Sequence, residues 1–273
     1  MITALVQHHP DYLDVAGNLD RMDETLTDLF DGDGADLVVL PELFASGYYF
    51  QNAADCAAVA EPVLGGPTTD FLLKWAVETG ATFVAGLPEA EGERRYNSAA
   101  VVGPGGLVGC YRKVHLFYRE KEVFAPGDRG FPVFDVADRQ GNGYRLGVMV
   151  CFDWYFPESA RALALGGADV IAHPSNLVRE DCPRAMPIRA LENHVFTVTA
   201  NRIGEETAHG ETLRFVGQSR ICGPEGDVLA EAGREEEAVL TAEIDPLAAR
   251  DRQITATNDL FGDRRPETYE ALR

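Results

Sequence analysis

The segment YRLGVMVCFDWYFPE, residues 144–158, contains a strand, a turn and the start of a helix. Its first half is a short apolar run, which is typical of a strand buried on both faces. Pro157 favours the first turn of a helix, and the pattern predicts a helix to Leu165. Cys151 stands between the two elements. The segment therefore predicts a unit of an α/β fold with a reactive residue type at the carboxyl end of its strand.

Two other segments have the same order of a buried strand followed by a polar residue. LVVL at 37–40 precedes Pro41 and Glu42, and VGCYR at 108–112 precedes Lys113. In open α/β sheets, ligand sites lie beyond the carboxyl ends of strands. We therefore expect Glu42, Lys113 and Cys151 to meet, although 71 and 38 residues separate them along the chain.

The rest of the chain alternates strands and helices. The expected strands are 2–7, 37–40, 82–87, 97–102, 107–111, 133–136, 144–150, 170–173, 196–200, 217–223, 228–231 and 239–244. The expected helices are one that Asn18 caps, then 68–79, 157–165 and 184–193. Hairpins mixed with βα units predict parallel and antiparallel pairing within a single domain, residues 1–273, and argue against a doubly wound nucleotide-binding fold.

Composition restricts the class of protein. The 273 residues are 45% hydrophobic, with no apolar stretch long enough for a membrane helix and no secretory signal at the start, so a cytoplasmic location is expected. The five cysteines contain no C-x-x-C pair, and the six histidines contain no H-x-x-x-H pair. We therefore expect no disulfide framework and no metal site.

The charge is strongly negative, with 44 acidic and 24 basic residues and a formal net charge of −20. That balance disfavours binding to nucleic acid or to an anionic membrane. Only three of the basic residues are lysines: Lys74, Lys113 and Lys121. Two explanations stay open, a coding bias towards arginine and an adaptation of the surface to high salt.

Taken singly, each of the three polar residues at the strand ends has an ordinary structural interpretation. Together they form a working set for nucleophilic catalysis. A free cysteine has a pKa of about 8.5 and needs a base or a positive neighbour to attack carbon. Glu42 can take the thiol proton, and Lys113 can stabilise an anion that develops on the substrate. The backbone N–H of Phe152, next to the nucleophile, is a second candidate donor.

These segments resemble the nitrilase superfamily of carbon–nitrogen hydrolases, and in particular its archaeal branch of aliphatic nitrilases and related amidases. The resemblance covers nearly the whole chain. It extends to PELF at 41–44, YRKVHLF at 111–117, PGD at 126–128, CFDWYFPE at 151–158, AHPSNL at 172–177, RALEN at 189–193 and NRIG at 201–204.

The resemblance implies roles for individual residues. Glu42 matches the family's general base, Lys113 its oxyanion-binding lysine and Cys151 its nucleophile. Glu120 matches a second glutamate near the triad, with Glu122 as a rival for that position. The resemblance also implies a four-layer α-β-β-α sandwich with mixed sheets, and a homodimer.

Residues that would bind the substrate are less sharply defined. Asn176 follows a strand and is expected to line the pocket. Tyr48 and Trp154, with Phe117 and Tyr155, either form an apolar wall for a small substrate or belong to the core.

The predicted reaction is hydrolysis of a small nitrile or amide to a carboxylic acid and ammonia through a thioester, with no cofactor. An alternative is an N-carbamoyl amine or amino acid hydrolase, or an ω-amidase, on the same triad. An acyltransferase would use an amine in place of water. Two alternatives from other classes are a non-catalytic binding protein and a metal-dependent hydrolase.

Overall fold

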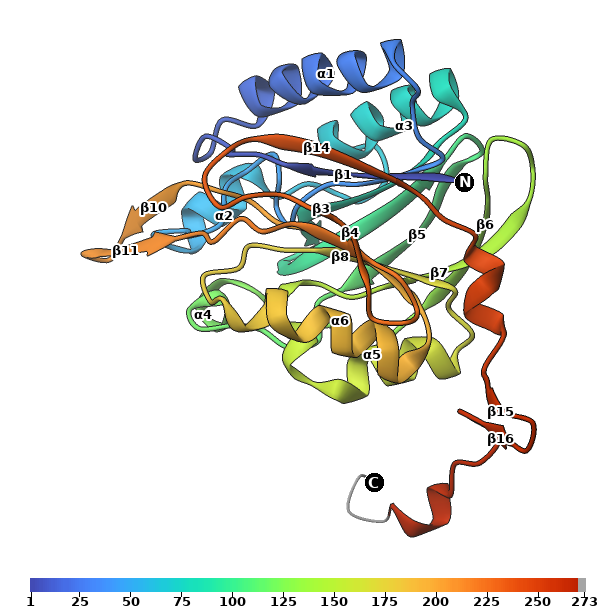
Figure 1. Cartoon of the computed structure of the whole chain (residues 1–273). Helices are drawn as coiled ribbons and strands as arrows, with labels where there is room; N and C mark the ends of the chain where they lie inside the picture. The colour runs from blue at the N-terminus through green and yellow to red at the C-terminus, as the bar shows by residue number, and fades with distance from the viewer. Residues whose placement is uncertain (270–273) are drawn as a thin grey trace.

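The computed structural model describes residues 1–269, which form four layers (Figure 1). Two sheets lie face to face in the middle. Helices α1 (Val15–Asp31) and α3 (Pro67–Thr79) cover the outer face of one sheet. Helices α5 (Pro157–Leu165) and α6 (Asp181–Asn193) cover the outer face of the other. The predicted α-β-β-α sandwich is confirmed.

The first sheet has the strand order β14-β1-β2-β3-β4-β5. Its strands are β1 (Ile2–Gln7), β2 (Leu37–Val39), β3 (Thr82–Glu91), β4 (Arg94–Gly103), β5 (Gly106–Arg112) and β14 (Ala238–Glu243). Strands β1, β2 and β3 pair in parallel, and the other pairs are antiparallel. The mixture of pairings that the sequence predicted is therefore present.

The second sheet has the strand order β13-β12-β9-β8-β7-β6. Its strands are β6 (Val133–Ala137), β7 (Gly143–Val148), β8 (Val170–Pro174), β9 (Phe196–Ala200), β12 (Arg220–Cys222) and β13 (Val228–Glu231). Strands β7, β8 and β9 pair in parallel, with antiparallel strands on either side. Both sheets thus have a parallel centre, and Glu42 and Cys151 follow strands of these centres, β2 and β7.

The central strands are mostly apolar because both of their faces are buried. In β1, Ala4 and Val6 pack in the core beneath α1 and α3, whereas Leu5 between them packs in the core shared by the two sheets. In β2, Val38 faces the helices, and Leu37 and Val39 face the second sheet. Alternate side chains of one run therefore fill two separate cores.

Two helix starts differ from the prediction. Helix α1 begins at Val15, and the side chain of Asp14 caps it by accepting the N–H of Gly17. Asn18 lies buried inside the helix, where its Nδ2 donates to the carbonyl of Ala45 at 2.7 Å. That tertiary bond, rather than capping, explains the asparagine. Helix α6 begins at Asp181, three residues before the predicted start.

Several short elements were not predicted because they have no long apolar period. They are α2 (Ala53–Val59), α4 (Glu120–Val123), the hairpin of β10 (Glu205–Ala208) and β11 (Glu211–Arg214), and the pair β15 (Gln253–Thr255) and β16 (Asn258–Asp259). The β10–β11 hairpin projects from one end of the sandwich, and the segment that contains β15 and β16 extends beyond the body of the sandwich (Figure 1). No helix within residues 1–269 combines the length and the apolar character that crossing a bilayer requires.

Candidate active site

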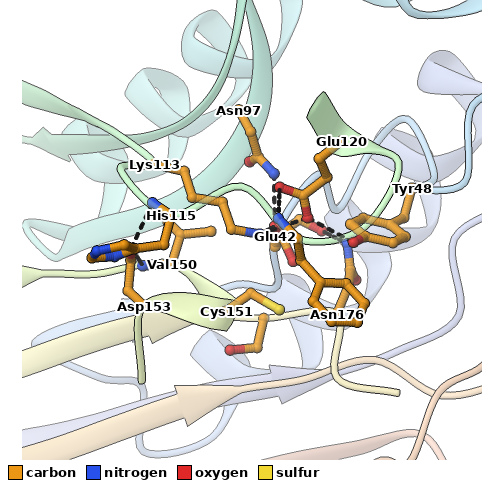
Figure 2. A network of polar contacts seen from close by, with 12 residues as sticks. Glu42, Tyr48, Asn97, Lys113, His115, Glu120, Val150, Cys151, Asp153 and Asn176 are labelled. Carbon is orange, nitrogen blue, oxygen red and sulfur yellow. Dashed lines mark hydrogen bonds and ion pairs between the residues drawn. The ribbon is translucent and has the colours of Figure 1, made fainter. Parts of the chain in front are cut away.

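Three side chains from three strand ends lie together in the interior. Glu42 follows β2, Lys113 follows β5, and Cys151 follows β7 of the other sheet. The Nζ of Lys113 donates to Glu42 Oε1 at 2.7 Å, and all three residues are buried. Figure 2 shows the sulfur of Cys151 directed towards this cluster. The strand ends of two sheets therefore place a thiol beside a buried ion pair.

The backbone at Cys151 is strained. Its φ is +43°, in the left-handed region that costs a non-glycine residue about 1–2 kcal/mol. The residue begins a short 3-10 helix, Cys151–Tyr155, directly after an extended Val150. His173 Nε2 donates to the carbonyl of Cys151 at 2.9 Å, which helps to hold the turn. The sharp turn presents the sulfur at the end of the strand.

Asp153 joins the segment of the nucleophile to the segment of the lysine. Its buried carboxylate accepts the N–H of Val150 at 2.8 Å, on the cysteine side. On the lysine side it accepts the hydroxyl of Tyr111 at 2.6 Å and the Nδ1–H of His115 at 2.8 Å. These bonds tie the end of β5 to the end of β7, so that Lys113 and Cys151 keep a fixed relation (Figure 2).

Glu120, rather than Glu122, occupies the position beside the triad. Its Oε1 accepts from Lys113 Nζ at 2.6 Å and from the hydroxyl of Tyr48 at 2.6 Å. Its side chain is 3% exposed, whereas that of Glu122 is 56% exposed and pairs with Arg119 on the surface. The structure thus separates the two candidates that the sequence left open.

The charges of this cluster shift its proton equilibria. Burial lowers the pKa of Lys113, but the carboxylates of Glu120 and Glu42 outweigh it and raise that pKa above its usual value. Burial, with the charge of Glu42, raises the pKa of Glu120 to about 7, although Lys113 opposes the shift. Burial and the charge of Glu42 also raise the pKa of the Cys151 thiol well above its usual range. The resting thiol is therefore neutral and requires a base before it can attack.

A small pocket with apolar walls opens onto the sulfur. Its lining residues are Phe117, Cys151, Phe152, Trp154, Tyr155, Asn176, Leu177, Val178 and Arg179. Phe152, Trp154 and Asn176, which were predicted to contact the substrate, are among them. Tyr48 is not, and its hydroxyl instead binds Glu120. Tyr48 was expected in the pocket wall, but it lies beside the charged cluster instead.

Comparison with known proteins gives this geometry a context. The carbon-nitrogen hydrolase family model matches residues 2–253. The chain belongs to the carbon-nitrogen hydrolase family. A nitrilase from Pyrococcus abyssi is 51% identical over 266 residues, which cover 97% of this chain and 98% of that protein. The N-carbamoylputrescine amidase of Solanum tuberosum is 37% identical over 260 residues, covering 88% and 84% of the two chains.

Solved structures agree with this hydrolase in fold. An amidase from Nesterenkonia sp. has a TM-score of 0.82 at 32% identity and covers 100% of this chain and 96% of its own. A variant of that amidase shows covalent addition of the acetamide moiety of fluoroacetamide at its active site cysteine; it has a TM-score of 0.80 at 31% identity and covers 100% and 97% of the two chains. The chain is a nitrilase-superfamily hydrolase that acts on carbon–nitrogen bonds.

Three polar residues of the hydrolase's site were not predicted. Asn97 Nδ2 donates to Glu42 Oε1 at 2.7 Å, so that this oxygen has two donors. Asp153 joins the two reactive segments, and His173, whose pKa burial lowers to about 4, supports the cysteine turn as a neutral ring. Asp153 and His173 lie within the quoted motifs CFDWYFPE and AHPSNL, and a polar residue at a buried strand end was the available signal. Asn97 begins a predicted strand and carries no comparable signal.

Proposed function

We propose that the chain hydrolyses small nitriles and amides with Cys151 as nucleophile, Glu42 as general base and Lys113 as oxyanion-binding residue. The observation that supports this most strongly is the buried ammonium of Lys113, held between Glu42 and Glu120 at 2.7 and 2.6 Å beside a buried thiol. Such a cluster is costly to bury, which favours a functional role over a structural one.

The reaction on an amide has two halves. The Sγ of Cys151 bonds to the carbonyl carbon while Glu42 takes the thiol proton. Glu42 returns this proton to the amide nitrogen, the carbon–nitrogen bond breaks, and ammonia leaves a thioester. Glu42 then takes a proton from water, whose hydroxide adds to the thioester carbon. The carbon–sulfur bond breaks, the acid is released, and the proton returns to the thiolate. On a nitrile, the Sγ of Cys151 adds to the nitrile carbon and Glu42 passes the thiol proton to the nitrogen, which gives a thioimidate. One water then adds to that carbon and ammonia leaves, which gives the same thioester.

Two donors would stabilise the negative charge that develops on the substrate. One is the ammonium of Lys113. The other is the backbone N–H of Phe152, because the second residue of a helix has no partner for its N–H within that helix. Glu120 would hold Lys113 in place and balance its charge, with Tyr48 as its second donor.

The pocket supports a small acyl group. Its walls at Phe152, Trp154 and Leu177 are apolar, and Arg179 is the charged residue among those that line it. These features fit short aliphatic nitriles and amides. The alternative, an N-carbamoyl amine or amino acid hydrolase or an ω-amidase, is supported by the N-carbamoylputrescine amidase relative.

One experiment tests the function and the choice of substrate. The purified protein is given aliphatic nitriles, dinitriles, ω-amides and N-carbamoyl amines, and released ammonia is measured. We expect turnover of short neutral substrates in the wild type and none in Cys151→Ala. Equal activity of the two proteins would contradict the proposal, and preference for N-carbamoyl amines would favour the alternative.

We also propose that residues 1–273 form one domain that works in the cytoplasm as a homodimer. Exposed apolar side chains on the outer face of α5 and α6, Leu165, Ile188 and Leu191, support pairing through that face. Light scattering should give the mass of at least two chains at micromolar concentration. A monomer under those conditions would contradict the homodimer. In that case Leu191→Glu would have no dimer to disrupt and should leave the mass unchanged.

A further inference from the structure

Glu206 is a buried carboxylate outside the proposed reacting groups. It lies in β10, where the side chains alternate between solvent and interior, and it is 8% exposed. Its Oε1 accepts from Arg202 Nη1 at 2.5 Å. Its Oε2 accepts the backbone N–H of Tyr49 at 2.6 Å and that of Tyr48 at 3.0 Å. One carboxylate therefore fixes two successive peptide groups of the loop after Glu42.

The surroundings are built around this contact. Gly47 has a φ of +78°, and a Cβ there would lie 2.9 Å from Glu206 Oε1, so that the loop approaches the carboxylate closely only with glycine. The guanidinium of Arg202 stacks on Phe215 at 4.0 Å, and the ring of Phe215 packs edge-on against Tyr48 at 5.9 Å. Both the backbone and the ring of Tyr48 are thus held from the β10 side.

Tyr48 carries this constraint into the charged cluster. Its hydroxyl donates to Glu120 Oε1 at 2.6 Å, and the same oxygen accepts from Lys113 at 2.6 Å (Figure 2). A tyrosine ring is rigid, so the position of its hydroxyl follows the position of its backbone. The N–H groups that Glu206 binds are therefore part of what places the carboxylate of Glu120.

We propose that Glu206 is a positioning residue for the hydrolase reaction, which acts through Tyr48 to hold Glu120 against Lys113. The proposal rests on the proposed function of the cluster. Neither Glu206 nor Tyr48 lines the pocket at Cys151. Their loss should therefore slow the chemical steps without weakening substrate binding.

The test compares three variants, Glu206→Gln, Tyr48→Phe and the double variant. Gln keeps the size of the side chain but replaces one acceptor oxygen by an NH₂ group, which faces either Arg202 or the two N–H groups. We expect each single variant to lower kcat about tenfold, the effect of losing one charge-assisted hydrogen bond, with little change in KM. Because both act along one chain of contacts, the double variant should be no slower than the slower single variant.

Glu205→Gln is the matched control. Glu205 precedes Glu206 in β10, but it is exposed and pairs with Arg214 on the surface. It should keep the kcat of the wild type. Near-UV circular dichroism shows whether each variant is folded. If Glu206→Gln is not, an unchanged kcat in Tyr48→Phe still overturns the positioning role.

Several outcomes would overturn the positioning role. They are an unchanged kcat in Tyr48→Phe or in folded Glu206→Gln, losses that multiply in the double variant, and an equal loss in Glu205→Gln. Cys151→Ala separates this failure from failure of the proposed function. If Cys151→Ala is inactive and Tyr48→Phe is as fast as the wild type, only the positioning role falls, whereas an active Cys151→Ala removes the function itself.

Discussion

The first sheet and its loops supply the charged side chains of the site, whereas the second sheet and its loops supply the sulfur and most of the pocket. Glu42 and Lys113 follow strands of the first sheet, and Glu120 lies in the segment after β5. Cys151 and Asn176 follow strands of the second. The charged side chains hold one another by hydrogen bonds of 2.6–2.7 Å. The cysteine is held chiefly through its backbone, by its strained turn and the bond from His173.

The site therefore has a charged half, formed by Glu42, Lys113 and Glu120, and a cysteine half, formed by Cys151 and its turn. The two halves should respond differently to substitution. In the charged half, removal of one member leaves buried partners without compensation, so that activity and stability are lost together. In the cysteine half, the side chain is a small buried group whose removal leaves the backbone contacts in place. The two halves should therefore separate when kcat and melting temperature are measured on the same variants.

The largest effect is expected from a substitution in the cysteine half. Cys151→Ala removes the attacking sulfur, and kcat should fall by roughly 10⁴-fold or more because no other group can take its place. The melting temperature should stay close to that of the wild type. Ammonia release measures the first consequence and a thermal melt measures the second. Substantial remaining turnover would mean that another residue is the nucleophile.

The next largest effect is expected from a substitution in the charged half. Lys113→Met keeps the bulk of the side chain but leaves Glu42 and Glu120 as two buried carboxylates without their shared cation. We expect kcat to fall by about 10³-fold and the free energy of unfolding by about 3–5 kcal/mol. Thermal melts of this variant and of Cys151→Ala, run side by side, measure the contrast.

Lys74→Met is the matched control for the lysine, because Lys74 pairs with Asp23 on the surface at 3.1 Å and is half exposed. Its effect on stability should be small beside that of Lys113→Met, because an exposed ion pair is screened by solvent. If Lys113→Met melts at the temperature of the wild type, then the two carboxylates do not depend on Lys113, and the proposed contrast between the halves fails.

The same contrast explains how far the sequence could go. The central strands were predictable because their runs are mostly apolar, and Glu42, Lys113 and Cys151 stood out because each follows such a run. Asn97 and the hydroxyl of Tyr48 were not identified in this way, because their bonds to Glu42 and Glu120 join residues 55 and 72 positions apart. Helix α1 was misplaced for a related reason, since Asn18 binds Ala45 rather than its own helix end. Local patterns therefore predicted which residues would react, but not which residues hold them.

A smaller effect is expected at Asp153, which joins the two halves of the site. Asp153→Asn leaves the size of the side chain unchanged but gives up the charge that accepts from Val150, Tyr111 and His115. We expect kcat to fall about tenfold and stability by about 1–3 kcal/mol. Asp135→Asn, a surface control paired with Arg145, should change neither quantity. A variant of Asp153 that is stable and fully active would show that the two halves keep their relation without this carboxylate.

The pH dependence of stability tests the charged half through Glu120. The pKa of Glu120 is raised to about 7 in the folded state, above the ordinary value of 4.5, so the folded state holds its proton more tightly than the unfolded state. Stability from this group is therefore full at low pH and is lost as pH rises through about 7. Between about pH 6 and pH 8 the wild type should lose about 1 kcal/mol from this group.

Glu120→Gln isolates that contribution. His173 shifts in the opposite direction, with its folded pKa lowered to about 4, and makes stability rise with pH from about 4 to its usual value of 6.5. This rise is common to both proteins and cancels in their difference. The free energy of unfolding of the wild type minus that of Glu120→Gln, from urea melts, should therefore fall as pH rises. A difference that is constant from about pH 6 to pH 8 would show that Glu120 does not titrate in this range.

The smallest effect concerns charges that neither half of the site uses. The net charge of −20 belongs mostly to exposed carboxylates, whereas the carboxylates of Glu42 and Glu120 are buried. Salt shortens the range of repulsion from about 30 Å at 0.01 M to about 3 Å at 1 M, and it screens exposed charges far more than buried pairs. If the acidic surface is an adaptation to salt, the melting temperature should rise from about 0.05 M to about 2 M KCl, most steeply at the low end. The kcat on a neutral amide should change less than the stability does, because the ion pairs of Lys113 are shielded from solvent.

NaCl at equal concentration should give the same rise in melting temperature if the cause is general screening. A melting temperature that is flat or falls with salt would favour coding bias as the origin of the composition. A kcat that follows the melting curve would instead show that the charges of the site are open to ions, contrary to the burial of Lys113.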